Sequence, residues 1–127
     1  MAVKFLSPEW ADLVKEALNA DEAFRAAASG AGATLQQVIT TPDGETHYWI
    51  KIGGGRIDMG VGDVEGADAT VTQSYETAVS LAKSELSPVT AFMTGRLKVG
   101  GNMGLLLGLQ GALTRLPVVM ATLDVEY

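Results

Sequence analysis

The fold is decided by residues 46–61, which read THYWIKIGGGRIDMGV. Apolar and polar side chains alternate on both sides of the Gly53–Gly55 turn. Such alternation is typical of two strands that each have one covered face and one wet face. We therefore expect strands at 46–52 and 56–61, joined as a hairpin.

Three further strands are expected around this hairpin. Residues 35–40 precede it across a turn that contains Pro42, and together the three strands should form an antiparallel meander. Residues 69–73 and 96–99 carry the same kind of pattern later in the chain. The sequence thus predicts a five-stranded, mainly antiparallel sheet.

Helices are predicted by their start signals. Side chains that cap a helix stand at Ser7, Asp21, Ser74 and Ser87, and a proline follows the first and the last of these. In the first helix, one face collects the apolar residues Trp10, Leu13, Val14, Ala17 and Leu18. A last helix is expected from Asn102 to about Arg115, before Pro117, and the pattern assigns no element to 118–127. The fold class is therefore α+β, with helices over one face of the sheet.

Composition bounds the class of protein. The 127 residues, 47% hydrophobic and 19% charged, are typical of one folded domain, which we take as 1–127. The formal charge of −6, with the basic residues scattered, argues against nucleic acid as a partner. No apolar run of signal-peptide length precedes Ser7, so we expect a cytoplasmic protein. The most apolar stretch, 99–114, is shorter than the ~20 residues that cross a bilayer, so no integral membrane segment is expected.

The sequence offers little for catalysis or metal binding. There is no cysteine, and the single histidine, His47, alternates with the polar face of its strand, as a surface residue does. The carboxylates Asp63, Glu65 and Asp68 miss the spacing of a calcium loop and fit a charged surface turn. We expect no enzyme activity, no metal and no cofactor. An enzyme acting on lipids would need an acid, base or nucleophile that the sequence does not show.

The last expected helix is unusually apolar. Apolar positions cover roughly 200° of it, about twice the arc that a helix lying on a sheet requires. One side of the helix carries Met103, Leu106, Leu107, Gln110 and Leu113. Three explanations stay open: a central helix buried by its own fold, a subunit partner, or an apolar ligand held between helix and sheet.

A family resemblance covers about 67–110. The residues that carry it are Ala67-Asp68-Ala69-Thr70-Val71-Thr72, Ser87-Pro88, Ala91-Phe92-Met93-Thr94-Gly95-Arg96-Leu97-Lys98-Val99, Gly101-Asn102-Met103-Gly104 and Leu109-Gln110. They resemble the C-terminal signature of the sterol carrier protein 2 (SCP2) family and the strand that leads into it. The resemblance implies helices over one face of a five-stranded sheet, with a hydrophobic tunnel between them. Such a tunnel binds sterols, fatty acids or fatty acyl-CoAs without chemistry.

The resemblance also suggests site residues. By position, the tunnel wall should include Phe92, Leu97 and Val99, and the last helix should contribute Met103, Leu106, Leu107 and Gln110. Gln110 either orients a lipid headgroup or bonds to backbone, and these two roles stay open. Strand alternation alone adds Tyr48, Ile50, Ile57 and Met59 as sheet-side lining.

We therefore expect noncovalent binding or carriage of an apolar lipid in the cytoplasm. The alternative is a structural module of the same fold that dimerises or docks another protein, with no physiological lipid; a homodimer is one form of it. Trp49 on the wet strand face slightly favours that alternative, because an exposed tryptophan is a common interface anchor.

Overall fold

The computed structural model describes residues 2–29, 32–83, 85–102, 104 and 110–126. Within these residues, five strands form one sheet in the order β4-β3-β2-β5-β6. The strands of this sheet are β2 (Ala33–Thr41), β3 (Gly44–Gly53), β4 (Arg56–Val61), β5 (Ala69–Ser74) and β6 (Lys98–Gly101). All neighbouring pairs are antiparallel except β2 and β5, which run parallel. The predicted five-stranded, mainly antiparallel sheet is confirmed.

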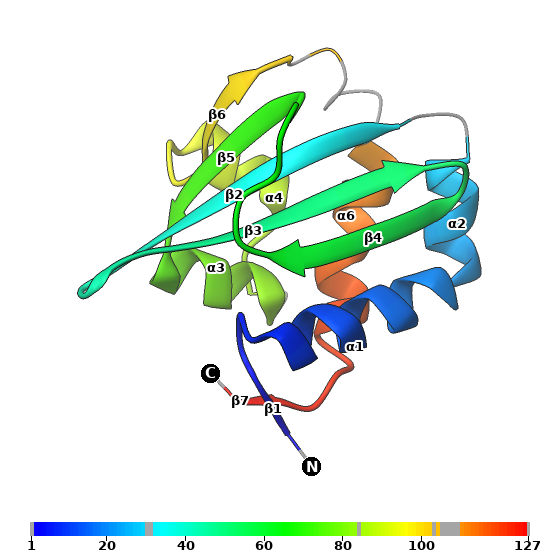
Figure 1. The fold of residues 1–127 in the computed structure, drawn as a ribbon, viewed down its shortest axis with the longest axis horizontal. Coiled ribbons are helices and arrows are strands. Elements are labelled where there is room, and N and C mark those ends of the chain that lie inside the picture. Colours follow the sequence, from blue (N-terminus) through cyan, green and yellow to red (C-terminus); the bar gives the residue numbers. More distant parts are fainter. Residues whose placement is uncertain (1, 30–31, 84, 103, 105–109, 127) are drawn as a thin grey trace.

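Helices gather on one side of the sheet, as Figure 1 shows. The described helices are α1 (Pro8–Asn19), α2 (Glu22–Ala28), α3 (Tyr75–Ala82), α4 (Pro88–Met93) and α6 (Gln110–Met120). The four expected caps are all made: the side chains of Ser7, Asp21, Ser74 and Ser87 each accept a hydrogen bond from the backbone N–H three residues on. The predicted α+β class, with helices over one face, is therefore confirmed.

The opposite, outer face of the sheet is crossed by the loop between β4 and β5 (Figure 1). Gln36 lies buried beneath this loop and binds it at two points. Its amide nitrogen donates to the carbonyl of Gly62 at 3.2 Å, and its amide oxygen accepts from the backbone N–H of Val64 at 2.8 Å. The crossing brings the chain from one edge of the sheet to the far side of β2, where β5 starts.

Helix α1 packs along β4 and closes the core at that edge. Trp10, Val14 and Leu18 have no exposed surface, because the apolar face predicted for this helix lies against the sheet. Asn19, the last residue of α1, bonds to the edge strand β4. The Asn19 side chain donates to the carbonyl of Ile57 at 3.0 Å and accepts from the Ile57 N–H at 2.9 Å. One amide thus satisfies two backbone groups of β4 that have no further strand to pair with.

One expectation about the C-terminal part is corrected, and residues 118–127, which the pattern left unassigned, contain the end of α6 and a short strand. The last helix was expected to end near Arg115, but α6 continues past Pro117 to Met120. A proline so close to a helix end removes one hydrogen bond and leaves few turns to disrupt, so the helix can contain it. The chain then forms β7 (Val125–Glu126), which pairs in parallel with β1 (Val3–Lys4). The sequence pattern predicted neither of these two-residue strands.

Replacing Asn19 by Ala should lower the free energy of unfolding by about 2 kcal/mol, since two backbone groups of β4 lose their partner. Urea unfolding of the full chain measures this. Glu16→Ala, an exposed change on the same helix, is the control and should shift stability by less than ~0.5 kcal/mol. Equal losses in the two variants would contradict the role given to Asn19.

Candidate functional site

The face of the sheet that meets the helices, here called the inner face, is almost wholly apolar. It carries the four sheet residues expected to line a site: Tyr48, Ile50, Ile57 and Met59, each at most 8% exposed. Ile50 lies directly opposite Met59 in the β3–β4 pairing, so these side chains share one surface. The structure therefore brings the four residues together on the side that the alternation predicted.

Aromatic rings cover part of this face. Trp10 of α1 meets Tyr48 edge-to-face, with ring centroids 5.2 Å apart, and Phe5 packs in the same way on Trp10 at 5.1 Å. Burial raises the pKa of the Tyr48 hydroxyl, so this group stays neutral in the interior. The aromatic contacts fix α1 against β3 at the end of the sheet where α1 begins.

Polar side chains interrupt the apolar inner face on β2 and β5. Gln37 and Gln73, 6% and 7% exposed, lie on β2 and β5, and the Gln73 amide nitrogen donates to the Gln37 amide oxygen at 3.2 Å. Gln37 is directly opposite Tyr48, which contacts Trp10. We call Trp10, Tyr48, Gln37 and Gln73 the inner polar row.

Two atoms of the inner polar row have no hydrogen-bond partner among the described residues. They are the Trp10 indole nitrogen, a donor, and the Gln73 amide oxygen, an acceptor. A buried polar atom without a partner destabilises the fold by about 1–3 kcal/mol. Such atoms are rare in folded proteins and call for an explanation.

The remaining expected site residues are distributed differently. Val99 lies opposite Val71 on β6 and is half-buried, and Leu97, also half-buried, comes just before that strand. Phe92 lies in α4 and is 44% exposed, so it does not join the buried inner face. Met103, Leu106 and Leu107 lie outside the described residues. Gln110 is the first residue of α6 as described, and its side chain also lies outside the description.

Gln37 and Gln73 were not among the expected site residues. Their signal was present, because each occupies an inward position of an alternating strand: Gln37 stands between Leu35 and Ile39, and Gln73 follows Val71 by two. A glutamine at such a position is buried in the same way as its apolar neighbours. The alternation of inward and outward positions along β2 and β5 would therefore have identified both residues.

His47 lies on the outer face, as expected, but it is held between two carboxylates. Its Nδ1 is 2.5 Å from an Asp63 oxygen, and its Nε2 is 3.0 Å from a Glu45 oxygen. The bond to Glu45, followed by that to Asp63, raises the pKa of His47. Asp63 therefore has a structural role in its surface turn, because its bond to His47 links the β4–β5 loop to β3. In the part of the chain that the structure describes, no three His, Asp or Glu side chains are arranged so that they could hold a metal ion.

Trp49, which was considered as an interface anchor, packs against residues of its own chain. It is half-buried, and its indole lies so close over Gly60 that a Cβ added there would be 2.5 Å from the ring. The Lys51 ammonium stands 5.5 Å from the centre of the same ring. Packing of the protein itself thus accounts for this tryptophan.

Comparison with known proteins identifies the family. A profile described as the SCP-2 sterol transfer family matches residues 11–114, which is most of the chain. The chain belongs to the SCP-2 sterol transfer family. This confirms the resemblance that residues 67–110 carry and extends it over α1, α2 and the hairpins.

Two relatives are much longer than this chain. Sterol carrier protein 2 of Gallus gallus is 33% identical over 70 residues, which make up 54% of this chain and 13% of that protein. Hydroxysteroid dehydrogenase-like protein 2 of Rattus norvegicus is 31% identical over 105 residues, or 82% of this chain and 19% of that protein. The chain therefore spans at most 19% of the length of these two relatives.

Solved structures agree with the family. A crystal structure of sterol carrier protein 2 superposes with a TM-score of 0.82 over 94% of this chain and 99% of that chain, at 22% identity, which shows a shared fold. Sterol carrier protein domain 2 of Helicoverpa armigera gives a TM-score of 0.64 at 27% identity, covering 94% of this chain and 90% of that one.

Family and fold together support binding or transfer of a lipid. The SCP-2 domain binds lipid and is not catalytic, although some relatives are enzymes of which it is only one part. Peroxisomal multifunctional enzyme A of Dictyostelium discoideum, for example, is matched over 24% of its length. Among the described residues, no helix is long and apolar enough to cross a membrane.

The His47 contacts predict a pH dependence of stability. A histidine whose pKa is raised by folding stabilises the folded state fully below its ordinary pKa of about 6.5, and this stabilisation is lost as pH rises through the raised pKa. The free energy of unfolding of the wild type should therefore fall, relative to His47→Gln, as pH rises from about 6. Urea unfolding at a series of pH values measures this difference, and parallel curves for the two proteins would contradict it.

Proposed function

We propose that this chain binds or carries an apolar lipid, of the sterol, fatty acid or fatty acyl-CoA class, noncovalently in a tunnel between the inner face and the helices. The proposed lining consists of Tyr48, Ile50, Ile57, Met59, Phe92, Leu97, Val99, Met103, Leu106, Leu107 and Gln110, to which we add Gln37 and Gln73. Membership of the SCP-2 family supports the class of ligand. No chemical step is proposed, because the described residues of the inner face include no acid, base or activated nucleophile.

The observation that carries this proposal is the pair of unpartnered polar atoms in the inner polar row. A solid core would select apolar side chains at Gln37 and Gln73, since an amide left without a partner destabilises the fold. A site that receives an amphipathic molecule needs the opposite arrangement, with apolar walls and a few polar groups that fix the orientation.

The two atoms without a hydrogen-bond partner favour a particular polar group on the ligand. The Gln73 amide oxygen can only accept a hydrogen bond, and the Trp10 indole can only donate one. A hydroxyl can pair with either atom, whereas an ionised carboxylate can pair only with the Trp10 N–H, because it has no hydrogen to offer Gln73. Within the proposed lipid classes, the inner polar row therefore favours a ligand whose buried end is an alcohol.

The function is tested by native mass spectrometry of the freshly purified full chain, with solvent extraction of any bound molecule. We expect a lipid to be released, and we expect the lipid-free protein to bind the fluorescent sterol dehydroergosterol, which carries one hydroxyl. A chain that holds no lipid after purification and binds neither this sterol nor a fluorescent fatty acid would contradict the function.

The role of the inner polar row is tested by the double variant Gln37→Leu/Gln73→Leu. Replacing both members of a buried pair by apolar groups of similar shape is nearly neutral for stability, so the variant should fold. It should bind dehydroergosterol about tenfold more weakly, because the hydroxyl loses its partner in the interior. The matched control is Thr70→Val/Thr72→Val, which alters the outer face of β5 at positions adjacent in the sequence and should leave binding unchanged.

If the double-leucine variant binds the sterol as tightly as the wild type, the inner polar row is not part of the site, although lipid binding itself stands.

The cytoplasmic location, the lack of a nucleic-acid partner and the alternative of a homodimer remain predictions. Cell fractionation and analytical ultracentrifugation of the lipid-free and lipid-bound protein test the first and the last.

A further inference from the structure

The segment before α1 packs against the aromatic end of the inner polar row. Residues Val3–Leu6, which we call the strap, contain β1 and the turn that leads into α1. Figure 1 shows the strap rising from its pairing with β7 toward α3 before α1 begins. Its Phe5 is 6% exposed and packs edge-to-face on two rings, with centroids 5.1 Å from Trp10 and 5.7 Å from Tyr75. Phe5 therefore lies between the first turns of α1 and α3.

These two contacts connect the strap to the inner polar row. Trp10 is itself a member of the row, and its indole nitrogen is one of the two atoms without a hydrogen-bond partner among the described residues. Tyr75 follows Gln73, which holds the other such atom, by two residues. The strap is therefore part of the cover of the row at this end of the sheet.

The turn that joins the strap to α1 is strained. The N–H of Ser7 donates to the carbonyl of Lys4 at 3.1 Å, which closes a four-residue turn. Leu6, the third residue of this turn, has a φ of +65°, in the left-handed region that favours glycine. Among the described residues, it is the only one other than glycine with a positive φ. Because a leucine disfavours this backbone conformation, other contacts of the strap must hold it in place.

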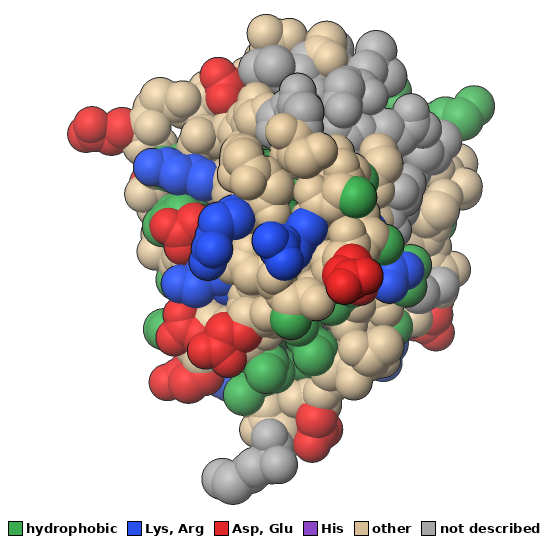
Figure 2. Space-filling model, turned by 90° about the vertical axis from the view of Figure 1, so that its right-hand side faces the viewer, with side chains coloured by type: hydrophobic (Ala, Val, Ile, Leu, Met, Phe, Trp, Pro, Cys, Tyr) green, Lys and Arg blue, Asp and Glu red, His purple; other side chains and the backbone are tan. Residues whose placement is uncertain are grey.

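The strand pairing that holds the strap is short. β1 and β7 pair over two residues each, and the N–H groups of Val3 and Phe5 donate to the carbonyls of Asp124 and Glu126. The apolar side chains of this ribbon are only partly buried against the core. Figure 2 shows hydrophobic side chains reaching the surface in the lower part of the molecule, at the height of the ribbon in Figure 1. Segments with so little pairing and burial open at a lower free energy than core strands do.

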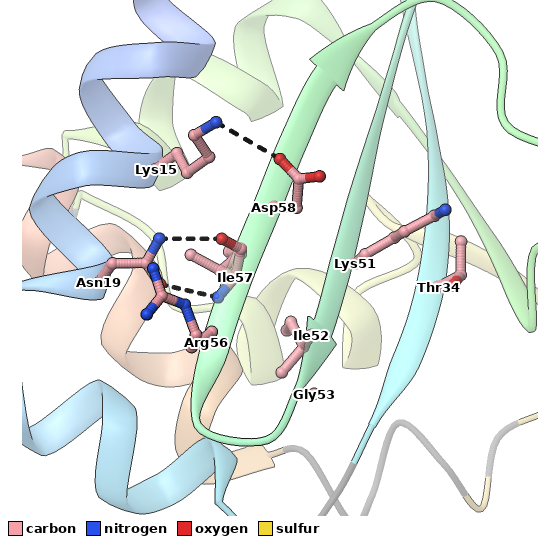
Figure 3. A pocket seen from close by; sticks show the side chains of 9 residues that line it. All are labelled: Lys15, Asn19, Thr34, Lys51, Ile52, Gly53, Arg56, Ile57 and Asp58. Carbon is pink, nitrogen blue, oxygen red and sulfur yellow. Dashed lines mark hydrogen bonds and ion pairs between the residues drawn. The ribbon is translucent and has the colours of Figure 1, made fainter.

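The helix that follows is held much more firmly. Trp10, Val14 and Leu18 of α1 have no exposed surface. Asn19 bonds to both backbone groups of Ile57, as the dashed lines in Figure 3 show. The strap can thus move while α1 stays in place, and Leu6 lies at the boundary between the two.

We propose that the strap is a gate through which a lipid reaches the inner polar row, with Leu6 as its hinge. In the closed state, Phe5 packs on Trp10 and Tyr75. In the open state, β1 separates from β7, Phe5 leaves the two rings, and Leu6 returns to a negative φ. The strain at Leu6 opposes the packing of Phe5 and so brings the two states closer in free energy, as a gate requires.

This inference rests on the lipid binding proposed above, and a disulfide that locks the strap tests it. The chain has no cysteine, and Val3 lies directly opposite Val125 in the pairing of β1 with β7. The variant Val3→Cys/Val125→Cys can therefore form one bridge, at a separation that a disulfide spans. Stopped-flow fluorescence measures the association rate of dehydroergosterol with the oxidised full chain and with the same sample after reduction.

We expect the oxidised form to take up the sterol roughly tenfold more slowly than the reduced form, because entry then lacks the conformational change that it requires. The Kd should stay within about twofold, since a gate slows entry and exit alike. The matched control is Thr34→Cys/Lys51→Cys, which places a bridge between directly opposite residues on the outer face of β2 and β3. Oxidation of this control should leave the rate unchanged.

Equal rates for the oxidised and reduced forms of Val3→Cys/Val125→Cys would overturn the gate, and so would an equal slowing by oxidation in the control. The proposed function fails separately. A wild type that binds no sterol contradicts lipid binding and the gate together, whereas sterol binding at a rate that the disulfide does not change overturns the gate alone.

The hinge is tested by comparing Leu6→Gly with Leu6→Ala. Both variants lose the leucine side chain, but only glycine adopts a positive φ without strain. The closed state should therefore be more populated in the glycine variant, which should take up dehydroergosterol about fivefold more slowly than the alanine variant. Equal rates in the two variants, or faster uptake by the glycine variant, would exclude Leu6 as the hinge and overturn the proposal.

Discussion

The amide of Gln36 holds the loop between β4 and β5 across the outer face of the sheet, and the arrangement of layers follows from this crossing. Its nitrogen bonds to the carbonyls of Tyr48 and Gly62, and its oxygen bonds to the N–H of Val64. Because the loop covers β3 and β2 on that side, β5 can reach the far side of β2 and lie parallel to it. The described helices then pack on the opposite face, where the apolar side chains of the sheet need cover.

Helix α1 contacts both the inner polar row and the edge strand β4. Near its start, Trp10 joins the inner polar row through Tyr48, and at its end Asn19 bonds to the backbone N–H and carbonyl of Ile57 in β4. The helix presents one stripe to the interior and another to the rim of β4 because successive side chains point in directions about 100° apart. A displacement of α1 would therefore alter both the inner polar row and the β4 edge.

Local signals predicted most of this fold. Each helix cap was recognisable because a cap needs only a side chain and the N–H three residues on, as at Ser7 and Asp21. The hairpin strands were recognisable by alternation. Pairing of β1 with β7 joins two-residue segments from the two ends of the chain, and so short a strand carries no detectable period.

The candidate site was predicted only in part, for a related reason. Four residues were correctly predicted to be buried, because the alternation along each strand alone places them on the inner face: Tyr48, Ile50, Ile57 and Met59. The alternation along a strand carries no information about hydrogen-bond partners, however. It could therefore not show that Asp63, 16 residues further on, binds His47, or that the Gln73 amide oxygen has no partner among the described residues. Phe92 was assigned to the wall by its position in the family signature, and this assignment stays a prediction. Its exposure of 44% depends on how α4 is oriented, which no local pattern encodes.

The pairing of β1 with β7 also has a mechanical consequence. The two strands are parallel, with the N–H of Val3 bonded to the carbonyl of Asp124 and that of Phe5 bonded to the carbonyl of Glu126. The two ends of the chain therefore leave this ribbon in opposite directions (Figure 1). A force that pulls the ends apart would load both bonds together, in shear, and would not open them one after the other like a zipper. Tension between the ends would thus meet this ribbon before it reached the five-stranded sheet.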